Sequence, residues 1–235
     1  MQQILSYMRK AIEDYNMIEE GDKIGVALSG GKDSITMLMA LKNLQRFYPK
    51  HFDIIAISIN PGFNFFDKTL LSNICSELDI PLFIEDTFIK EIVFDERKEK
   101  SPCSLCANFR RGALNSVAIR ENCNKIALGH NEDDVLETFL LNLLYTGSIN
   151  TFSPVSYMDR SQITLIRPLI YTPEKYIKKF VNKNNINIMN KVCPMDGISK
   201  REDMKTMIKD LQINIPHIRA NLFGAIKRNI KEWKK

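Results

Sequence analysis

The stretch that decides the fold is KIGVALSGGKDS, which runs from Lys23 to Ser34. Its apolar half predicts a buried strand, Gly30 and Gly31 predict a tight turn, and the apolar residues that follow predict a helix. Glycines let backbone N–H groups approach an anion, and the positive end of the new helix stabilises that anion. Phosphate is therefore the expected ligand of the turn.

The polar side chains of the turn agree with a phosphate ligand. Lys32 adds a mobile cation, Ser29 and Ser34 add hydroxyl donors, and Asp33 is suited to holding Mg²⁺. The alternative is an ordinary helix-capping turn, but capping accounts for one polar residue and not for the whole set. The predicted ligand is a metal-bound polyphosphate. The residues expected to bind it are Ala27, Leu28, Ser29, Gly30, Gly31, Lys32, Asp33 and Ser34.

Composition favours a cytoplasmic enzyme with one large core. The chain has 235 residues, of which 44% are hydrophobic, enough for one α/β core with a small appendage. No apolar run is long enough to span a membrane, and Glu13, Asp14, Glu19 and Glu20 follow the first residues too closely for a secretory signal. Five cysteines are an odd number for a secreted disulfide framework, so ligand or catalytic roles are expected instead.

Apolar runs and helical patterns alternate along the chain. Strands are predicted over 23–28, 53–59, 81–85, 124–128 and 163–166. The alternation predicts a doubly wound α/β fold with a mainly parallel five-stranded sheet and a C-terminal helical extension. Three parts are expected: an N-terminal helix over 1–20, an α/β domain over 21–170, and a basic helical segment over 171–235. The helices expected before the tail span 2–20, 33–47, 67–78 and 135–145.

A Cys-x-x-Cys motif, Cys103 to Cys106, opens another predicted helix. Such a pair suits either metal ligation or disulfide redox chemistry. Zinc would require four ligands, and Cys193 offers a third sulfur without an obvious fourth. Cys75 and Cys123 are interpreted as buried small hydrophobic residues, because they lie among core positions. Three thiolates with one open position are typical of a reactive cubane iron–sulfur cluster.

The fourth predicted strand leads into the polar turn GHNEDD, from Gly129 to Asp134. This turn is expected at the same sheet edge as the Ser-Gly-Gly turn. Asp133 and Asp134 are either acids that complement the helix dipole or contacts to the phosphates or a second Mg²⁺. The neighbouring ATP site favours a functional role for Asp134 and His130 and decides nothing for Asp133. Arg167, which follows the fifth strand, is either a contact to phosphate or substrate or a structural salt-bridge partner.

The tail is basic. From Ser199 to Lys235 there are ten Lys and Arg against four Asp and Glu, so this segment carries more than the net charge of +5 of the whole chain. Lysines that neutralise phosphates favour a nucleic-acid partner. The alternative is that the two amphipathic helices expected here pack on the core and keep their lysines in solvent.

The motifs together resemble a known family. SGGKDS resembles the PP-loop of the N-type ATP pyrophosphatases, which binds ATP and supports cleavage between the α- and β-phosphates. CSLC from Cys103, IALGHNEDDVLET from Ile126, IRPL from Ile166, and Cys193 occur in the order found in the TtcA-like tRNA 2-thiocytidine synthetases of the TtcA/TtuA group. One departure is Asp196, which stands where larger relatives usually carry a further cysteine near the third ligand.

The resemblance implies an ATP-, Mg²⁺- and [4Fe–4S]-dependent tRNA thiolase. Such an enzyme adenylates a pyrimidine carbonyl, here C2 of cytidine 32, replaces its oxygen by sulfur, and releases AMP and pyrophosphate. A cysteine desulfurase or free sulfide would supply the sulfur, and the chain would form a homodimer. Cys103, Cys106 and Cys193 would hold the cluster, and Lys32, Asp33 and Asp134 would be catalytic. Nucleotide contacts would also come from Ile59, Gly129 and His130.

Other functions stay open at this point. One is a cluster-free PP-loop ligase or amidotransferase that acts on tRNA. A second is an iron–sulfur desulfidase of thiolated bases, although the complete ATP motif argues against it. A third is a zinc-stabilised RNA-binding module, which would leave Ser29 to Ser34 without a purpose.

Overall fold

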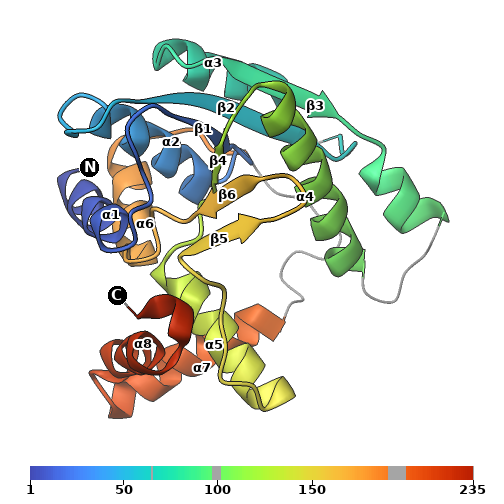
Figure 1. Cartoon of the computed structure of the whole chain (residues 1–235). Helices are drawn as coiled ribbons and strands as arrows, with labels where there is room; N and C mark the ends of the chain where they lie inside the picture. The colour runs from blue at the N-terminus through green and yellow to red at the C-terminus, as the bar shows by residue number, and fades with distance from the viewer. Residues whose placement is uncertain (65, 97–101, 190–199, 235) are drawn as a thin grey trace.

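A six-stranded sheet runs through the molecule in the strand order β3-β2-β1-β4-β6-β5 (Figure 1). The computed structural model describes residues 1–64, 66–96, 102–189 and 200–234. The strands are β1 Asp22–Ala27, β2 Phe52–Asn60, β3 Leu82–Asp86, β4 Lys125–Ala127, β5 Val155–Met158 and β6 Ile163–Ile166. The helices are α1 Gln2–Asp14, α2 Lys32–Leu44, α3 Lys68–Glu77, α4 Pro102–Arg120, α5 Glu132–Thr146, α6 Glu174–Lys183, α7 Lys200–Asn214 and α8 Ile218–Asn229, with short helical turns η1 Glu91–Glu96 and η2 Lys231–Trp233.

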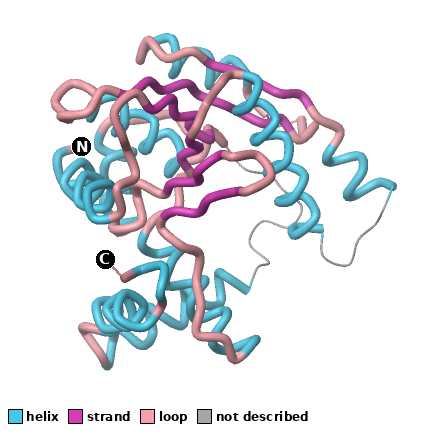
Figure 2. Tube along the Cα trace, viewed as in Figure 1, coloured by secondary structure: helices cyan, strands magenta, loops and turns pink. Residues whose placement is uncertain are grey.

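The strand register brings several carboxyl ends to one edge. β1 pairs in parallel with β2 and with β4, so that Ala27 lies opposite Ile57 and Val26 lies opposite Ala127. The chain builds outward from β1 in one direction to β2 and β3, and afterwards in the other direction to β4 and β6. Figure 2, in the same view as Figure 1, shows the strands in magenta with helices in cyan around them. Ligands of such sheets bind where the strand order reverses. The edge between β1 and β4 is that place here.

Helices cover both faces of the sheet, because the strands are apolar on both sides. In β2, Ile54 and Ala56 belong to the core that includes α1, α2 and α6. Ile55 and Ile57 alternate with them and belong to a second core formed with α4. Opposite faces of one strand are thus both buried, as expected for a parallel strand inside a doubly wound sheet.

The expected α/β fold, doubly wound with a mainly parallel sheet, is confirmed, but the sheet has six strands and not five. The additional strand is β5, which pairs antiparallel with β6 at the sheet edge. It has four residues and follows Pro154, so its pattern is too short to distinguish it from a loop. All five expected strands are present, and α2, α3 and α5 lie where helices were predicted, within a few residues. The first helix was expected to end near Glu20, but α1 ends at Asp14, and Asn16 just beyond it has a left-handed φ of +47° that cannot continue the helix.

The last helices pack beside α5 at the lower end of the view in Figure 1. The end of the chain is anchored by Trp233, whose fully buried indole donates a hydrogen bond from Nε1 to the Phe152 carbonyl at 3.2 Å. The Trp233 carbonyl accepts one from Tyr15 Oη at 3.1 Å, which ties this end to the first helix. The division into parts at residues 20 and 170 stays a prediction. In the described ranges, no helix combines the length and apolar character needed to cross a bilayer.

Candidate functional site

The Ser-Gly-Gly turn joins β1 to α2 with the geometry expected of an anion site. Gly30 has a φ of +76°. This conformation is unfavourable for any residue that has a side chain. Ser34 Oγ accepts a hydrogen bond from the Ser29 amide at 3.1 Å and donates one to the Gly31 carbonyl at 3.0 Å. Gly31 is the N-cap of α2 and supplies no side chain to bond the first amides of the helix. These amides are therefore directed toward the carboxyl edge of the sheet without a side-chain cap.

Two glycines allow close approach of backbone around this turn. A Cβ at Gly129 would lie 3.3 Å from the Ser34 amide nitrogen, tighter than most real Cβ contacts. A Cβ at Gly30 would lie 2.8 Å from Cβ of Met189, whose amide donates a hydrogen bond to the Gly30 carbonyl at 2.8 Å. The loop after β4 and the segment ending at Met189 thus enclose the turn.

Lys32 and Asp33 are paired in this structure. Lys32 Nζ lies 2.8 Å from Asp33 Oδ2 and 3.0 Å from Glu174 Oε1. Burial opposes the charged ammonium, but the two carboxylates outweigh it and raise the pKa of Lys32. Asp33 Oδ1 also accepts a hydrogen bond from Asn131 Nδ2 at 3.0 Å, which links the turn to the start of α5.

Asn131 begins α5 with a capping box. Its side chain accepts hydrogen bonds from the amides of Asp133 and Asp134, and Asp134 Oδ2 accepts the Asn131 amide at 2.9 Å. Burial raises the pKa of Asp134. Asp133 Oδ2 instead accepts the Glu174 amide at 2.7 Å and pairs with Arg219 at 2.9 Å. Of the two alternatives for Asp133, these contacts favour a structural role.

A cavity of about 270 Å³ opens beside the turn. Residues predicted to bind the nucleotide form part of its wall, and α4 forms the opposite part. The predicted residues in the wall are Ala27, Leu28, Ser29, Ile59 and His130, and the α4 residues are Ala107, Arg110, Arg111 and Leu114.

His130 is half-buried in the wall of this cavity, with its ring 4.7 Å from the ring of Phe152. Burial first, and the charge of Arg167 second, lower the pKa of His130 to about 3, so the imidazole is neutral near pH 7. Its Nδ1 has no hydrogen-bond partner among the described residues. Arg167 donates from Nη1 to the Ser153 carbonyl at 2.6 Å and to Ser156 Oγ at 3.3 Å.

The cysteines separate into two kinds. Cys103 is exposed and Cys106 is half-buried, both at the start of α4, where Cys106 packs against the sheet. Cys193, the third predicted ligand, and Asp196 lie outside the described residues. Cys75 and Cys123 are buried, as predicted, and burial raises the pKa of each thiol to about 11. Among the described residues, no three His, Cys, Asp or Glu form a metal-binding group.

Sequence reasoning assigned no role to four residues at this site. Asn131 could have been found, because Asn followed three residues later by an acid is a capping-box pattern. Arg110 lies four residues after Cys106, one helical turn away, so its place near the cysteines could also have been inferred. Nothing near Glu174 or Met189 in the sequence signals their contacts with the turn.

Comparison with known proteins identifies the family of this chain. A family model described as PP-loop domain matches residues 2–194. The tRNA-cytidine(32) 2-sulfurtransferase of Pelobacter propionicus is 39% identical over 92% of this chain and 82% of its own length. The enzyme of the same name from Syntrophotalea carbinolica is 40% identical over 92% of this chain and 85% of its own length.

Solved structures give the same result. The U34-tRNA thiolase NcsA from Methanococcus maripaludis, solved with its [4Fe-4S] cluster, matches with a TM-score of 0.74 and 25% identity over 95% of this chain and 77% of that one. The NH3-dependent NAD synthetase of Campylobacter jejuni, with a TM-score of 0.53 and 14% identity over 100% of this chain and 96% of that one, shows a shared fold alone. The chain therefore belongs to the PP-loop family, in the branch of the tRNA-cytidine(32) 2-sulfurtransferases.

Proposed function

We propose that this chain is an ATP-dependent, iron–sulfur-dependent tRNA thiolase that replaces the C2 oxygen of cytidine 32 by sulfur. One observation carries the proposal: α4, whose first turn contains Cys103 and Cys106, forms a wall of the cavity beside the Ser-Gly-Gly turn. This arrangement supports activation by ATP and delivery of sulfur from two sides of one space. The tRNA-cytidine(32) 2-sulfurtransferases named above support the choice of base and position.

The turn is suited to the ATP phosphates. The uncapped start of α2, the bare backbone of Gly30 and Gly31, and the Lys32 ammonium are all groups that bind polyphosphate. Asp33 and Asp134 would hold Mg²⁺, since carboxylate oxygens are its preferred protein ligands. The adenosine would lie in the cavity lined by Ile59 and by the neutral His130.

Adenylation is the step that these residues serve. A cytosine C2 carbonyl is a poor electrophile, and oxide is a poor leaving group. Attack of the carbonyl oxygen on the α-phosphate forms an adenylate and expels pyrophosphate, whose developing charge Lys32 and the α2 amides stabilise. The sulfur atom then attacks C2 and AMP departs, so no side chain of this chain has to act as the nucleophile.

Cys103, Cys106 and Cys193 would hold the [4Fe–4S] cluster. When bound, the cluster would supply an iron with an open coordination position that is suited to sulfide. The donor set fits, because two thiols lie within one turn at the start of α4. Cys193 lies outside the described residues, and its place in the ligand set rests on the resemblance of the motifs. We further propose a cytoplasmic homodimer that receives sulfur from a cysteine desulfurase or as free sulfide.

The test is mass spectrometry of tRNA nucleosides from a strain in which this gene is deleted. Loss of 2-thiocytidine, restored by the intact gene and not by a Lys32→Ala copy, is the expected result. Iron and acid-labile sulfide measured after anaerobic purification then separate this function from a cluster-free ligase or amidotransferase. A normal 2-thiocytidine content in the deletion strain would overturn the proposal.

A further inference from the structure

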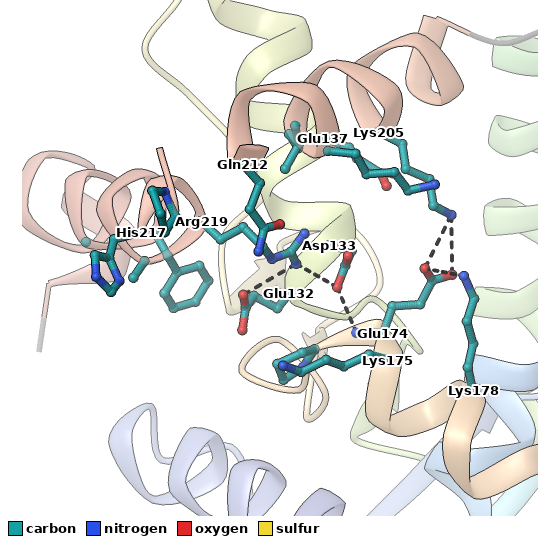
Figure 3. Close-up of a pocket in the computed structure, with 17 residues that line it drawn as sticks. Glu132, Asp133, Glu137, Glu174, Lys175, Lys178, Lys205, Gln212, His217 and Arg219 are labelled. Atoms are coloured by element: carbon teal, nitrogen blue, oxygen red, sulfur yellow. Dashed lines mark hydrogen bonds and ion pairs between the residues drawn. The ribbon is translucent and has the colours of Figure 1, made fainter. Parts of the chain in front are cut away.

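A second, larger cavity of about 700 Å³ lies between α5, α6, α7 and α8, and we call it the C-terminal pocket (Figure 3). Nine of the seventeen residues in its wall are charged, and both signs occur among them. Arg219 reaches across it from α8 to Glu132 and Asp133 at the start of α5. The carboxylate of Glu174, the first residue of α6, lies where this pocket adjoins the nucleotide turn.

Three lysines from three helices converge on Glu174. Lys32 from α2 lies 3.0 Å from Oε1, and Lys178 from α6 and Lys205 from α7 lie 2.8 and 3.3 Å from Oε2. In Figure 3, Lys205 from α7 and Lys178 from α6 both point at the Glu174 carboxylate. The Glu174 side chain is only 10% exposed. Its amide donates to Asp133, which fixes the backbone at this point.

The charge balance around Glu174 matches that of an anion site. Burial opposes ionisation, but the hydrogen bonds from Lys178 and Lys32 and the charge of Lys205 outweigh it and lower the pKa of Glu174 to about 2. The carboxylate is therefore ionised at every physiological pH. Several ammonium groups around one buried anion are also the arrangement that binds a phosphate group.

We propose that Glu174 is a positioning residue whose carboxylate forms an ion pair with the Lys32 ammonium in the nucleotide-free protein. When ATP binds, a phosphate oxygen replaces the Glu174 carboxylate as the partner of Lys32. The inference rests on the proposed function, because it requires ATP at the turn. A phosphate bound to Lys32 and the Glu174 carboxylate repel each other, so the two anions cannot both form a close ion pair with the ammonium. After the exchange, Glu174 still has Lys178 and Lys205, so no buried carboxylate is left unpaired.

Glu174→Gln tests this exchange by titration calorimetry of ATP, with and without Mg²⁺. Removing the competing charge should tighten ATP binding about three- to tenfold, because an ion pair of this exposure contributes on that scale. In the thiolation assay, KM for ATP should fall because a competing charge has been removed. The kcat should also fall, because Lys32 loses its fixed position. A merely structural role would raise KM and lower the melting temperature instead.

Chemical labelling of lysines provides the second readout. Without ATP, Lys32 in Glu174→Gln should react with trinitrobenzenesulfonate several-fold faster than in the parent protein, because its ammonium loses a partner. With ATP bound, the two proteins should react alike. Glu202→Gln, which removes an exposed carboxylate from the first turn of α7, is the matched control and should change neither readout.

Weaker or unchanged ATP binding by Glu174→Gln overturns the inference. If ATP binding were weaker only in buffer that contains Mg²⁺, Glu174 would be a metal ligand, and the inference would be wrong for that reason. If the parent protein itself bound no ATP, the proposed function would fail together with the inference. If the parent bound ATP and Glu174→Gln did not differ from it, the inference alone would fail.

Discussion

The nucleotide turn and the C-terminal pocket adjoin each other but are built in opposite ways. Most contacts of the turn join residues a few positions apart, such as Ser29 with Ser34 and Lys32 with Asp33. Most ion pairs of the pocket join residues of different helices, such as Arg219 with Asp133 and Lys205 with Glu174. The backbone of the turn is therefore encoded in one stretch of sequence, and only its contacts with Glu174, Asn131 and Met189 depend on other segments. The C-terminal pocket exists only after four helices have packed.

The largest effect is expected at the turn itself. Lys32→Ala and Asp33→Ala should each lower ATP-dependent thiolation by about a thousandfold or more, because they remove charge stabilisation from the leaving pyrophosphate or from Mg²⁺. Circular dichroism and the cluster spectrum should stay unchanged, since the cysteines belong to other segments. Lys209→Ala, in the wall of the C-terminal pocket, is the control and should change ATP binding less than twofold. A cluster lost together with the fold in either variant would contradict this separation.

The next prediction concerns the cysteines, because α4, which carries Cys103 and Cys106, forms the other wall of the nucleotide cavity. Replacing Cys103, Cys106 or Cys193 by Ala should abolish both the anaerobic iron–sulfur spectrum and thiolation, while ATP binding measured by calorimetry should persist. Cys75→Ala and Cys123→Ala should keep both, at a stability cost of about 1 kcal/mol for a buried side chain. A spectrum that survives in Cys193→Ala would remove this residue from the ligand set.

Glycine substitutions test how much of the turn is local. Gly30→Ala should lower the free energy of unfolding by about 2 to 3 kcal/mol, because φ is +76° and the new Cβ would lie 2.8 Å from Met189. Gly112→Ala is the matched control. It lies inside α4 with no atom near the new Cβ, and it should stabilise the protein by up to about 1 kcal/mol. Urea denaturation measures both, and equal losses would show that the conformation of Gly30 has no special cost.

The smallest effect is expected from Glu137 in the C-terminal pocket. Burial, followed by the charge of Asp134, raises the pKa of Glu137 to about 7. Because the pKa is higher in the folded than in the unfolded protein, this group lowers stability progressively as pH rises from about 4.5 to about 7. Glu137→Gln should therefore be more stable than the parent by about 1 to 2 kcal/mol at pH 8 after allowance for solvent screening, and no more stable at pH 4. A pH-independent difference in melting temperature would exclude this explanation.

Local chemistry explains what the sequence by itself determined. The strand, the turn and the start of α2 follow from apolar runs and glycines within a dozen residues. The burial of Cys75 and Cys123 followed equally from their apolar neighbours. Such features depend on backbone dihedral angles and on hydrogen bonds between near neighbours, which a short stretch encodes.

Only the tertiary structure decided which distant groups meet at these sites. No local pattern places Glu174 on Lys32, Met189 against Gly30, or α4 along the wall of the nucleotide cavity. The short antiparallel strand β5 escaped prediction for a related reason, because its pairing with β6 and not its own pattern makes it a strand. Ion pairs and close packing depend on how helices far apart in the chain settle on the sheet, and that arrangement is a property of the whole core.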